Sequence, residues 1–150
     1  SLWGNYPDSL EIPLKGKASR AYLLMAGSTN HMQCHIDNGV IRIYYKDGTR
    51  DVMFLRNPDN WPPIEHIFFE DGLAFNRHTP ALYRLRLKTG EISNNFGEEL
   101  GFPGASRELD GGAAVLLEMP LNPGKKLSHL VLETLSNDVV IGLMSITLQR

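Results

Sequence analysis

The chain has a single cysteine and no excess of charge of either sign, and each lack excludes a class of protein. With Cys34 alone, the chain has no internal disulfide and no zinc site built from several cysteines. The 15 basic and 17 acidic residues give a formal net charge of −2, which argues against a nucleic-acid-binding protein because such proteins carry a basic excess. No run of 18 apolar residues is present, so the sequence predicts no transmembrane helix.

Helix signals are also scarce, because no window of 11 residues combines an apolar stripe of helical period with caps at both ends. Short apolar runs bounded by turn residues are abundant instead. They predict strands over 20–26, 31–36, 39–45, 51–55, 64–69, 81–87, 113–119, 127–134 and 139–148. About nine or ten short strands with turns at these intervals predict one all-β domain, an antiparallel β-sandwich or jelly roll. The domain spans residues 1–150, and residues 1–9 form a lead-in segment.

Two turn signals organise the middle of the chain. Asn38-Gly39 predicts a hairpin because both residues tolerate positive φ, and Lys46-Asp47-Gly48 marks the next turn, so 31–55 predicts a three-stranded meander. Alternation along 39–45 divides the side chains between two faces. The face without Arg42 is expected to point into the core, since an unpaired arginine is costly to bury. The expected core face carries Ile41, Ile43 and Tyr45, and the opposite face carries Val40, Arg42 and Tyr44.

The proline-rich loop 56–63 holds the most informative binding candidate. Trp61 stands among prolines that would hold its ring as a rigid plate. Apolar faces of sugar rings stack on such plates, while amide, carboxylate and imidazole groups bind hydroxyls. The alternative, which carries more weight because large aromatics are mostly buried, is that Trp61 tucks under the loop and plugs one end of the sandwich. The candidate carbohydrate-binding residues are Trp61, Asn60, Asp59, Glu65 and His66.

Catalytic and metal motifs are weak. The chain has no phosphate loop, dinucleotide fingerprint or Gly-x-Ser-x-Gly elbow, and nothing pairs two carboxylates as a glycoside hydrolase needs. Cys34 and His35 point to opposite faces of a strand, and His31 and His35 lie roughly 13 Å apart at strand rise. We therefore expect no catalytic and no metal-binding residue. A structural calcium ion is the one cofactor left open, because the loop 93–111 offers oxygen ligands. These are Asn94, Asn95, Glu98, Glu99 and Asp110.

A pair of arginines marks the predicted strand 81–87. Arg84 and Arg86 share one face of it, opposite Tyr83 and Leu85. We expect this face to be solvated or salt-bridged, and less often to be a carboxylate-binding site.

Two segments, taken together, resemble a known type of domain. One begins with the strand at Ala21 and continues through the Tyr45-Lys46-Asp47-Gly48 hairpin to the loop before His66, and the other is the closing strand from Asn137 to Leu148. This order is similar to the galactose-binding-like jelly-roll domains appended to bacterial glycoside hydrolases. More closely, it resembles the uncharacterised C-terminal domain of large bacterial proteins related to six-hairpin, rhamnosidase-like glycoside hydrolases. The resemblance covers roughly residues 7–150.

The resemblance implies a jelly roll, a periplasmic or secreted location, and a catalytic domain elsewhere in the parent chain. Because the sequence begins at Ser1 rather than Met, we also expect a fragment of a larger protein. We hypothesise a non-catalytic accessory domain of a carbohydrate-active enzyme, which binds an oligosaccharide weakly or braces the catalytic domain. The alternative is a purely structural, protein-interaction module without a sugar site. Neither nucleic acid nor membrane is an expected partner.

Overall fold

The computed structural model describes residues 8–28, 36–56, 60–61, 82–93, 112–136 and 139–150, and this part of the chain contains strands and no helix. It therefore holds no helix that could span a membrane. The strands are β1 (Ser9–Pro13), β2 (Arg20–Ser28), β3 (Asp37–Tyr45), β4 (Arg50–Arg56), β5 (Arg84–Arg86), β6 (Ile92–Ser93), β7 (Ala113–Pro120), β8 (Leu127–Thr134) and β9 (Val140–Gln149).

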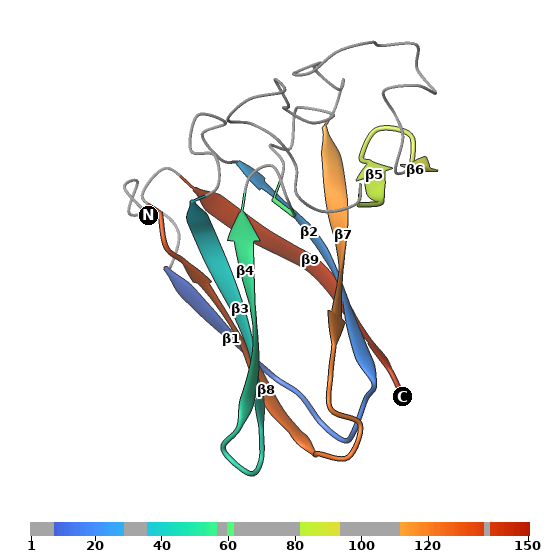
Figure 1. The fold of residues 1–150 in the computed structure, drawn as a ribbon. Coiled ribbons are helices and arrows are strands. Elements are labelled where there is room, and N and C mark those ends of the chain that lie inside the picture. The colour runs from blue at the N-terminus through green and yellow to red at the C-terminus, as the bar shows by residue number, and fades with distance from the viewer. Residues whose placement is uncertain (1–7, 29–35, 57–59, 62–81, 94–111, 137–138) are drawn as a thin grey trace.

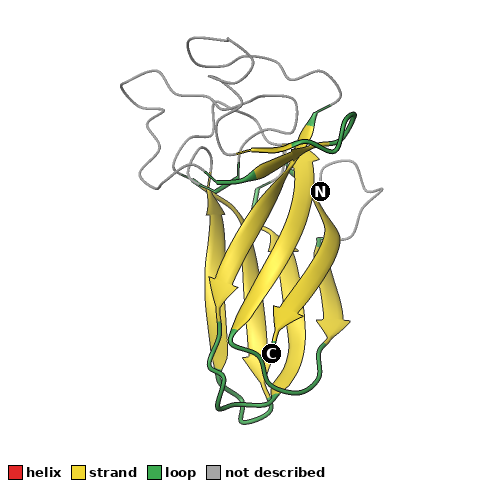
Figure 2. Cartoon of the chain, turned by 90° about the vertical axis from the view of Figure 1, so that its right-hand side faces the viewer, coloured by secondary structure: helices red, strands yellow, loops and turns green. Residues whose placement is uncertain are grey.

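The strands form two antiparallel sheets, as the sequence predicted for a β-sandwich (Figures 1 and 2). One sheet has four strands in the order β1-β8-β3-β4, and the other has five in the order β6-β5-β7-β2-β9. The β3–β4 turn and the β7–β8 turn lie at the same end of the sandwich, at the bottom of Figure 1. The sheet order thus brings together two turns that are far apart in the sequence.

Alternating side chains of both sheets fill the space between the layers. The prediction for β3 is confirmed, because Ile41 and Ile43 are fully buried and Tyr45 is 4% exposed. Opposite them, β2 and β7 bury the alternate residues of their own runs. These residues are Ala21, Leu23, Met25, Val115, Leu117 and Met119.

The hairpin predicted at Asn38-Gly39 is wrong, because β3 begins at Asp37 and runs straight through both residues. The register with β4 shifts between Asp37 and Gly39, so Asn38 sits in a β-bulge. Close packing rather than a turn favours glycine here, since a Cβ on Gly39 would displace Cδ1 of Ile141 and would lie 3.1 Å from the backbone oxygen of Glu133. The second turn signal is confirmed: Gly48 has a φ of 89° and donates its N–H to the Tyr45 carbonyl oxygen at 3.1 Å.

Three other expectations about strands need correction or fall outside the described residues. The sequence did not predict β1, which begins at Ser9, the last residue of the lead-in segment, and pairs with β8. The strand predicted over 81–87 is confined to β5, and the unpredicted two-residue strand β6 pairs with it. The predicted strands 31–36 and 64–69 lie outside the described residues, apart from Ile36, which precedes β3.

Candidate functional site

Asn60, one of the predicted sugar ligands, hydrogen-bonds to the open edge of β4. Its Oδ1 accepts from the N–H of Arg56 at 2.7 Å, and its Nδ2 donates to the carbonyl oxygen of Phe54 at 2.8 Å. The backbone N–H of Asn60 also donates to the Arg56 carbonyl oxygen at 3.0 Å. The side-chain amide therefore satisfies backbone groups that a neighbouring strand would otherwise pair with. Its oxygen and one of its N–H donors are thus already engaged, which leaves few hydrogen-bonding groups for a sugar.

Trp61 is 1% exposed and belongs to the hydrophobic core. Its backbone N–H donates to the Arg56 carbonyl oxygen at 3.1 Å, and its ring lies so close to Gly27 that a Cβ there would be 2.8 Å from Cζ2. The buried indole Nε1 has no hydrogen-bond partner within the described part of the chain. In this position the ring offers no face to a sugar, as the packing alternative anticipated. The other candidate ligands, Asp59, Glu65 and His66, lie outside the described residues.

A cavity of about 200 Å³ opens between the edge of β4 and the half of β7 that extends beyond β5. Met53, Leu116 and Leu117 give it an apolar wall, and Tyr22, Asn60 and Glu118 are its polar neighbours. These polar groups already have partners, because the Tyr22 hydroxyl lies 3.3 Å from Oε1 of Gln149 and Glu118 pairs with Arg20. The volume is below the roughly 300–1,000 Å³ of ordinary small-molecule sites, so the cavity has room for one small group.

The outer face of the four-stranded sheet carries a stacked pair of rings. Tyr44 and His129 oppose each other on β3 and β8, with ring centroids 4.6 Å apart and planes at 10°. Arg50 Nη1 lies 3.4 Å from the Tyr44 hydroxyl, and Ser128 Oγ lies 2.9 Å from Nδ1 of His129. Glu11 Oε1 is 4.0 Å from Nε2 of the same ring. Each ring thus has one of its two faces occupied by the other.

The same face exposes apolar side chains next to an ion pair. Val52 is 41% exposed and Phe54 is 45% exposed, and both point away from the core because the alternate residue Leu55 is fully buried. On the neighbouring strands, Arg42 Nη1 pairs with Glu133 Oε2 at 2.8 Å. We call Val52 and Phe54 the β4 patch.

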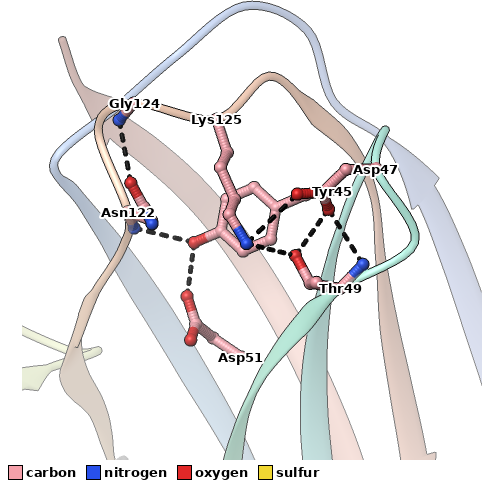
Figure 3. Close-up of polar contacts among 7 residues, drawn as sticks. All are labelled: Tyr45, Asp47, Thr49, Asp51, Asn122, Gly124 and Lys125. Carbon is pink, nitrogen blue, oxygen red and sulfur yellow. Dashed lines mark hydrogen bonds and ion pairs between the residues drawn. The ribbon is translucent and has the colours of Figure 1, made fainter.

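A polar cluster joins the two turns at the far end of the sandwich (Figure 3). The Tyr45 hydroxyl donates to Oδ2 of Asp51 and accepts the backbone N–H of Asn122 at 2.8 Å. Burial, followed by the hydrogen bond to Asp51, raises the pKa of the Tyr45 phenol. A phenol held in its protonated form and hydrogen-bonded on both sides suits a structural role better than a role as a base.

Asp47 and Lys125 extend this cluster across the two turns. Asp47 Oδ1 accepts from the N–H of Thr49 at 2.9 Å and from its hydroxyl at 2.5 Å, and Lys125 Nζ lies 3.1 Å from Asp47 Oδ2. The hydrogen bonds from Thr49, then the one from Lys125, lower the pKa of Asp47 to about 2. Lys125 Nζ also bonds the Thr49 hydroxyl at 2.8 Å and stands 5.7 Å from the centre of the Tyr45 ring. The sequence marked the turn of Asp47 but gave no signal for its partner in the other turn.

The two arginines of β5 share a face, as predicted, and that face is buried at Arg84 and salt-bridged at Arg86. Arg84 is 6% exposed, and its Nη2 donates to the Ala113 carbonyl oxygen at 2.9 Å. Arg86 pairs more loosely, with Nη1 3.6 Å from Oε1 of Glu91. Arg84 is buried rather than solvated because it lies opposite the core residue Val115 of β7, and residues that oppose each other across a strand pair share one face of the sheet.

Within the described residues no three histidine, cysteine or acidic side chains gather closely enough to hold a metal ion. The oxygen ligands considered for calcium, in the loop from Asn94 to Asp110, lie outside those residues. Comparisons with protein-family models, with curated proteins and with solved structures find no match for this chain.

Proposed function

We propose that this chain is a non-catalytic accessory domain of a carbohydrate-active enzyme, and that it braces the catalytic domain of its parent chain through the outer face of the four-stranded sheet. The jelly-roll type, the parent enzyme and a periplasmic or secreted location rest on the resemblance described above. The choice of bracing over sugar binding rests on the described side chains.

The observation that carries the proposal is the β4 patch. Val52 and Phe54 lie side by side on one strand, each more than 40% exposed, and the Arg42–Glu133 ion pair lies on the adjoining strands of the same face. Aromatic, aliphatic and arginine side chains in contact are typical of the centre of a protein–protein interface. Neighbouring exposed apolar side chains also lower solubility unless a partner covers them.

The burial of Trp61 supports bracing over sugar binding. A stacking platform needs an exposed aromatic face, and Trp61 is 1% exposed. The stacked pair of Tyr44 and His129 is a poor substitute, because the two rings cover each other on one side.

The direct test is association of this chain with the separately produced remainder of the parent chain, measured by isothermal titration calorimetry. The double substitution Val52→Ser and Phe54→Ser should weaken binding roughly tenfold or more, because the loss of a central aromatic anchor together with its apolar neighbour is expected to cost about 1.4 kcal/mol or more in total. Ile92→Ser is the matched control, since Ile92 is 67% exposed on a strand of the other sheet. Failure to associate, or equal loss in the control, would contradict the proposal.

A thermal-shift screen against neutral and acidic oligosaccharides tests the sugar-binding alternative. A ligand at ten times its Kd would add about 1.4 kcal/mol, which raises the Tm of a domain of this size by roughly 3–6 °C. Bracing predicts no shift with any sugar class. A reproducible shift with one class would favour a carbohydrate-binding module instead.

A further inference from the structure

The outer edge of β9 is the longest edge that the described strands leave open. β9 has ten residues and pairs with β2 on one side, and no other described strand pairs with it. The backbone N–H of Leu121 donates to the carbonyl oxygen of Ser19. Since the backbone groups of successive residues in a strand point to opposite sides, the odd-numbered residues of β2 hydrogen-bond to β7 and the even-numbered residues hydrogen-bond to β9. It follows from this register that the N–H and C=O groups of Ile146 and Leu148 point away from β2, toward the open side.

The apolar side chains of β9 are incompletely buried for the same reason. Those that pack against the core remain partly exposed, whereas Leu23 and Met25 on the adjacent β2 are 0% exposed. A strand laid along the C-terminal half of this edge would cover the flank of Ile146 and Leu148 and satisfy the outward backbone groups there. The partly buried set is Ile141, Leu143, Ile146 and Leu148.

The composition of the edges indicates which strand fits there. β9 contains no charged residue and no proline, so two copies of it can lie against each other without repulsion. β4 carries the charged residues Arg50, Asp51 and Arg56, and Asn60 already hydrogen-bonds to its edge. β1 contains Glu11 and Pro13. β6 has only two residues. Among the described sheet edges, β9 is therefore the one suited to pairing with itself.

We propose that two copies of this chain associate through antiparallel pairing of β9 with β9 about a two-fold axis at Thr147. The pairing lies on the C-terminal side of the bulge that separates Leu143 from Ser145. In this register the outward N–H and C=O groups of Ile146 in each copy hydrogen-bond to those of Leu148 in the other copy. The five-stranded sheets then join into one continuous sheet across the dimer.

The side chains match in this register. Ile146 of one copy opposes Leu148 of the other on the inner face, which extends the core, and Ser145 opposes Gln149 on the outer face. Thr147 of one copy opposes Thr147 of the other, and such cross-strand threonine pairs are favourable because their hydroxyls can hydrogen-bond. Because the same surface is used on both copies, the assembly closes as a dimer rather than growing into a filament. The inference is independent of the β4 patch, which lies on the other sheet.

Sedimentation equilibrium tests the proposal with protein from about 1 to about 200 µM, a range that covers micromolar dissociation constants. We expect twice the 16.8 kDa mass of the chain at the upper concentrations. Ser145→Lys with Thr147→Lys should weaken the dimer roughly tenfold, because like charges would oppose each other across the axis. The control is Ile92→Lys, which places a charge on the opposite edge of the same sheet. A monomer at every concentration, or a dimer unaffected by the two lysines, would overturn the proposal.

Crosslinking tests the register. In a Cys34→Ser background, Thr147→Cys should give a disulfide-linked dimer on oxidation by glutathione disulfide. Residues that oppose each other in a non-hydrogen-bonded pair have Cα atoms about 4.5 Å apart, within the range of disulfide geometry. Ile92→Cys in the same background should stay largely monomeric. Equal crosslinking of the two variants would contradict the axis at Thr147.

Discussion

At Gly39, an added methyl group would meet an identified neighbouring side chain. Its absent Cβ leaves space for Cδ1 of Ile141 from the facing sheet, and the next neighbours are Glu133 O at 3.1 Å and Leu55 Cδ1 at 3.3 Å. Gly39→Ala should therefore destabilise the fold by about 1–3 kcal/mol through overpacking. Urea unfolding followed by circular dichroism measures the change in the free energy of unfolding.

A double-mutant cycle separates this collision from a general loss of strand geometry. Ile141→Val removes Cδ1, so the Gly39→Ala/Ile141→Val double variant should be more stable than the sum of the two single changes predicts, by about 0.5–3 kcal/mol. Strict additivity would show that Ile141 is not the obstacle. Asn-Gly in the sequence predicted a turn here, because the local signal carries no information about a contact with a strand a hundred residues away.

Trp61 gives opposite predictions under its two interpretations. If its burial is structural, Trp61→Ala should cost about 3–5 kcal/mol of folding stability because a large cavity replaces the ring. Trp61→Phe should recover a large part of this loss. Chemical unfolding of the three proteins measures it, and a stable Trp61→Ala variant would favour the exposed, sugar-stacking interpretation instead.

At the scale of elements, Asn60 protects the edge of β4. Asn60→Ala removes the acceptor for Arg56 N–H and the donor to Phe54 O, and each bond contributes about 0.5–1.5 kcal/mol. We expect faster amide hydrogen exchange at Arg56, which native-state exchange followed by NMR measures residue by residue.

Asn60→Asp is the informative control for this edge. It keeps an oxygen for the N–H of Arg56 but loses the donor to Phe54 O, and so exchange at Arg56 should stay closer to that of the unsubstituted protein. Equal exchange rates in Asn60→Ala and the unsubstituted protein would show that the amide does not protect the edge.

The elements were partly predictable from the sequence. The long strands β2, β7, β8 and β9 and the core face of β3 follow from apolar runs and period-two alternation. β1 was hidden because its alternation of Leu10 and Ile12 is short and ends in Pro13. The burial of Arg84 was also hidden, since alternation assigns a residue to a face but does not say which face is covered.

At the scale of the whole molecule, the sheet order decides which turns meet. The candidate site could be anticipated only in part for this reason: the turn at Asp47 is a local signal, but Lys125 reaches it because β3–β4 and β7–β8 end together (Figure 3). Similarly, the prolines in the sequence drew attention to Asn60 and Trp61. The burial of Trp61 in the core and the hydrogen bonds of Asn60 to β4 depend on neighbouring strands, which the local sequence does not reveal.

Asp47 makes the contact between the two turns dependent on pH. The pKa of its carboxyl is about 2 in the folded protein against an ordinary value of 3.8, so the unfolded chain binds the proton more tightly. Its contribution to stability is therefore fully present above about pH 4 and is lost as the pH falls toward 2. The stability difference between the unsubstituted protein and Asp47→Asn should be constant near neutral pH and should shrink over this window, as urea unfolding at each pH would measure.

The cause of the low pKa can be tested by NMR titration of the Asp47 carboxyl carbon. Thr49→Val removes the hydroxyl donor, which is the largest cause, and Lys125→Met removes the ammonium group of the other turn. Both should raise the midpoint from about 2, and Thr49→Val should raise it more. If Lys125→Met had the larger effect, the ion pair between the turns rather than the local Thr49 hydrogen bonds would set the pKa of Asp47. An unchanged midpoint in both variants would mean that the cluster does not hold the two turns together in solution, and the pH dependence of folding would then have to arise elsewhere in the sandwich.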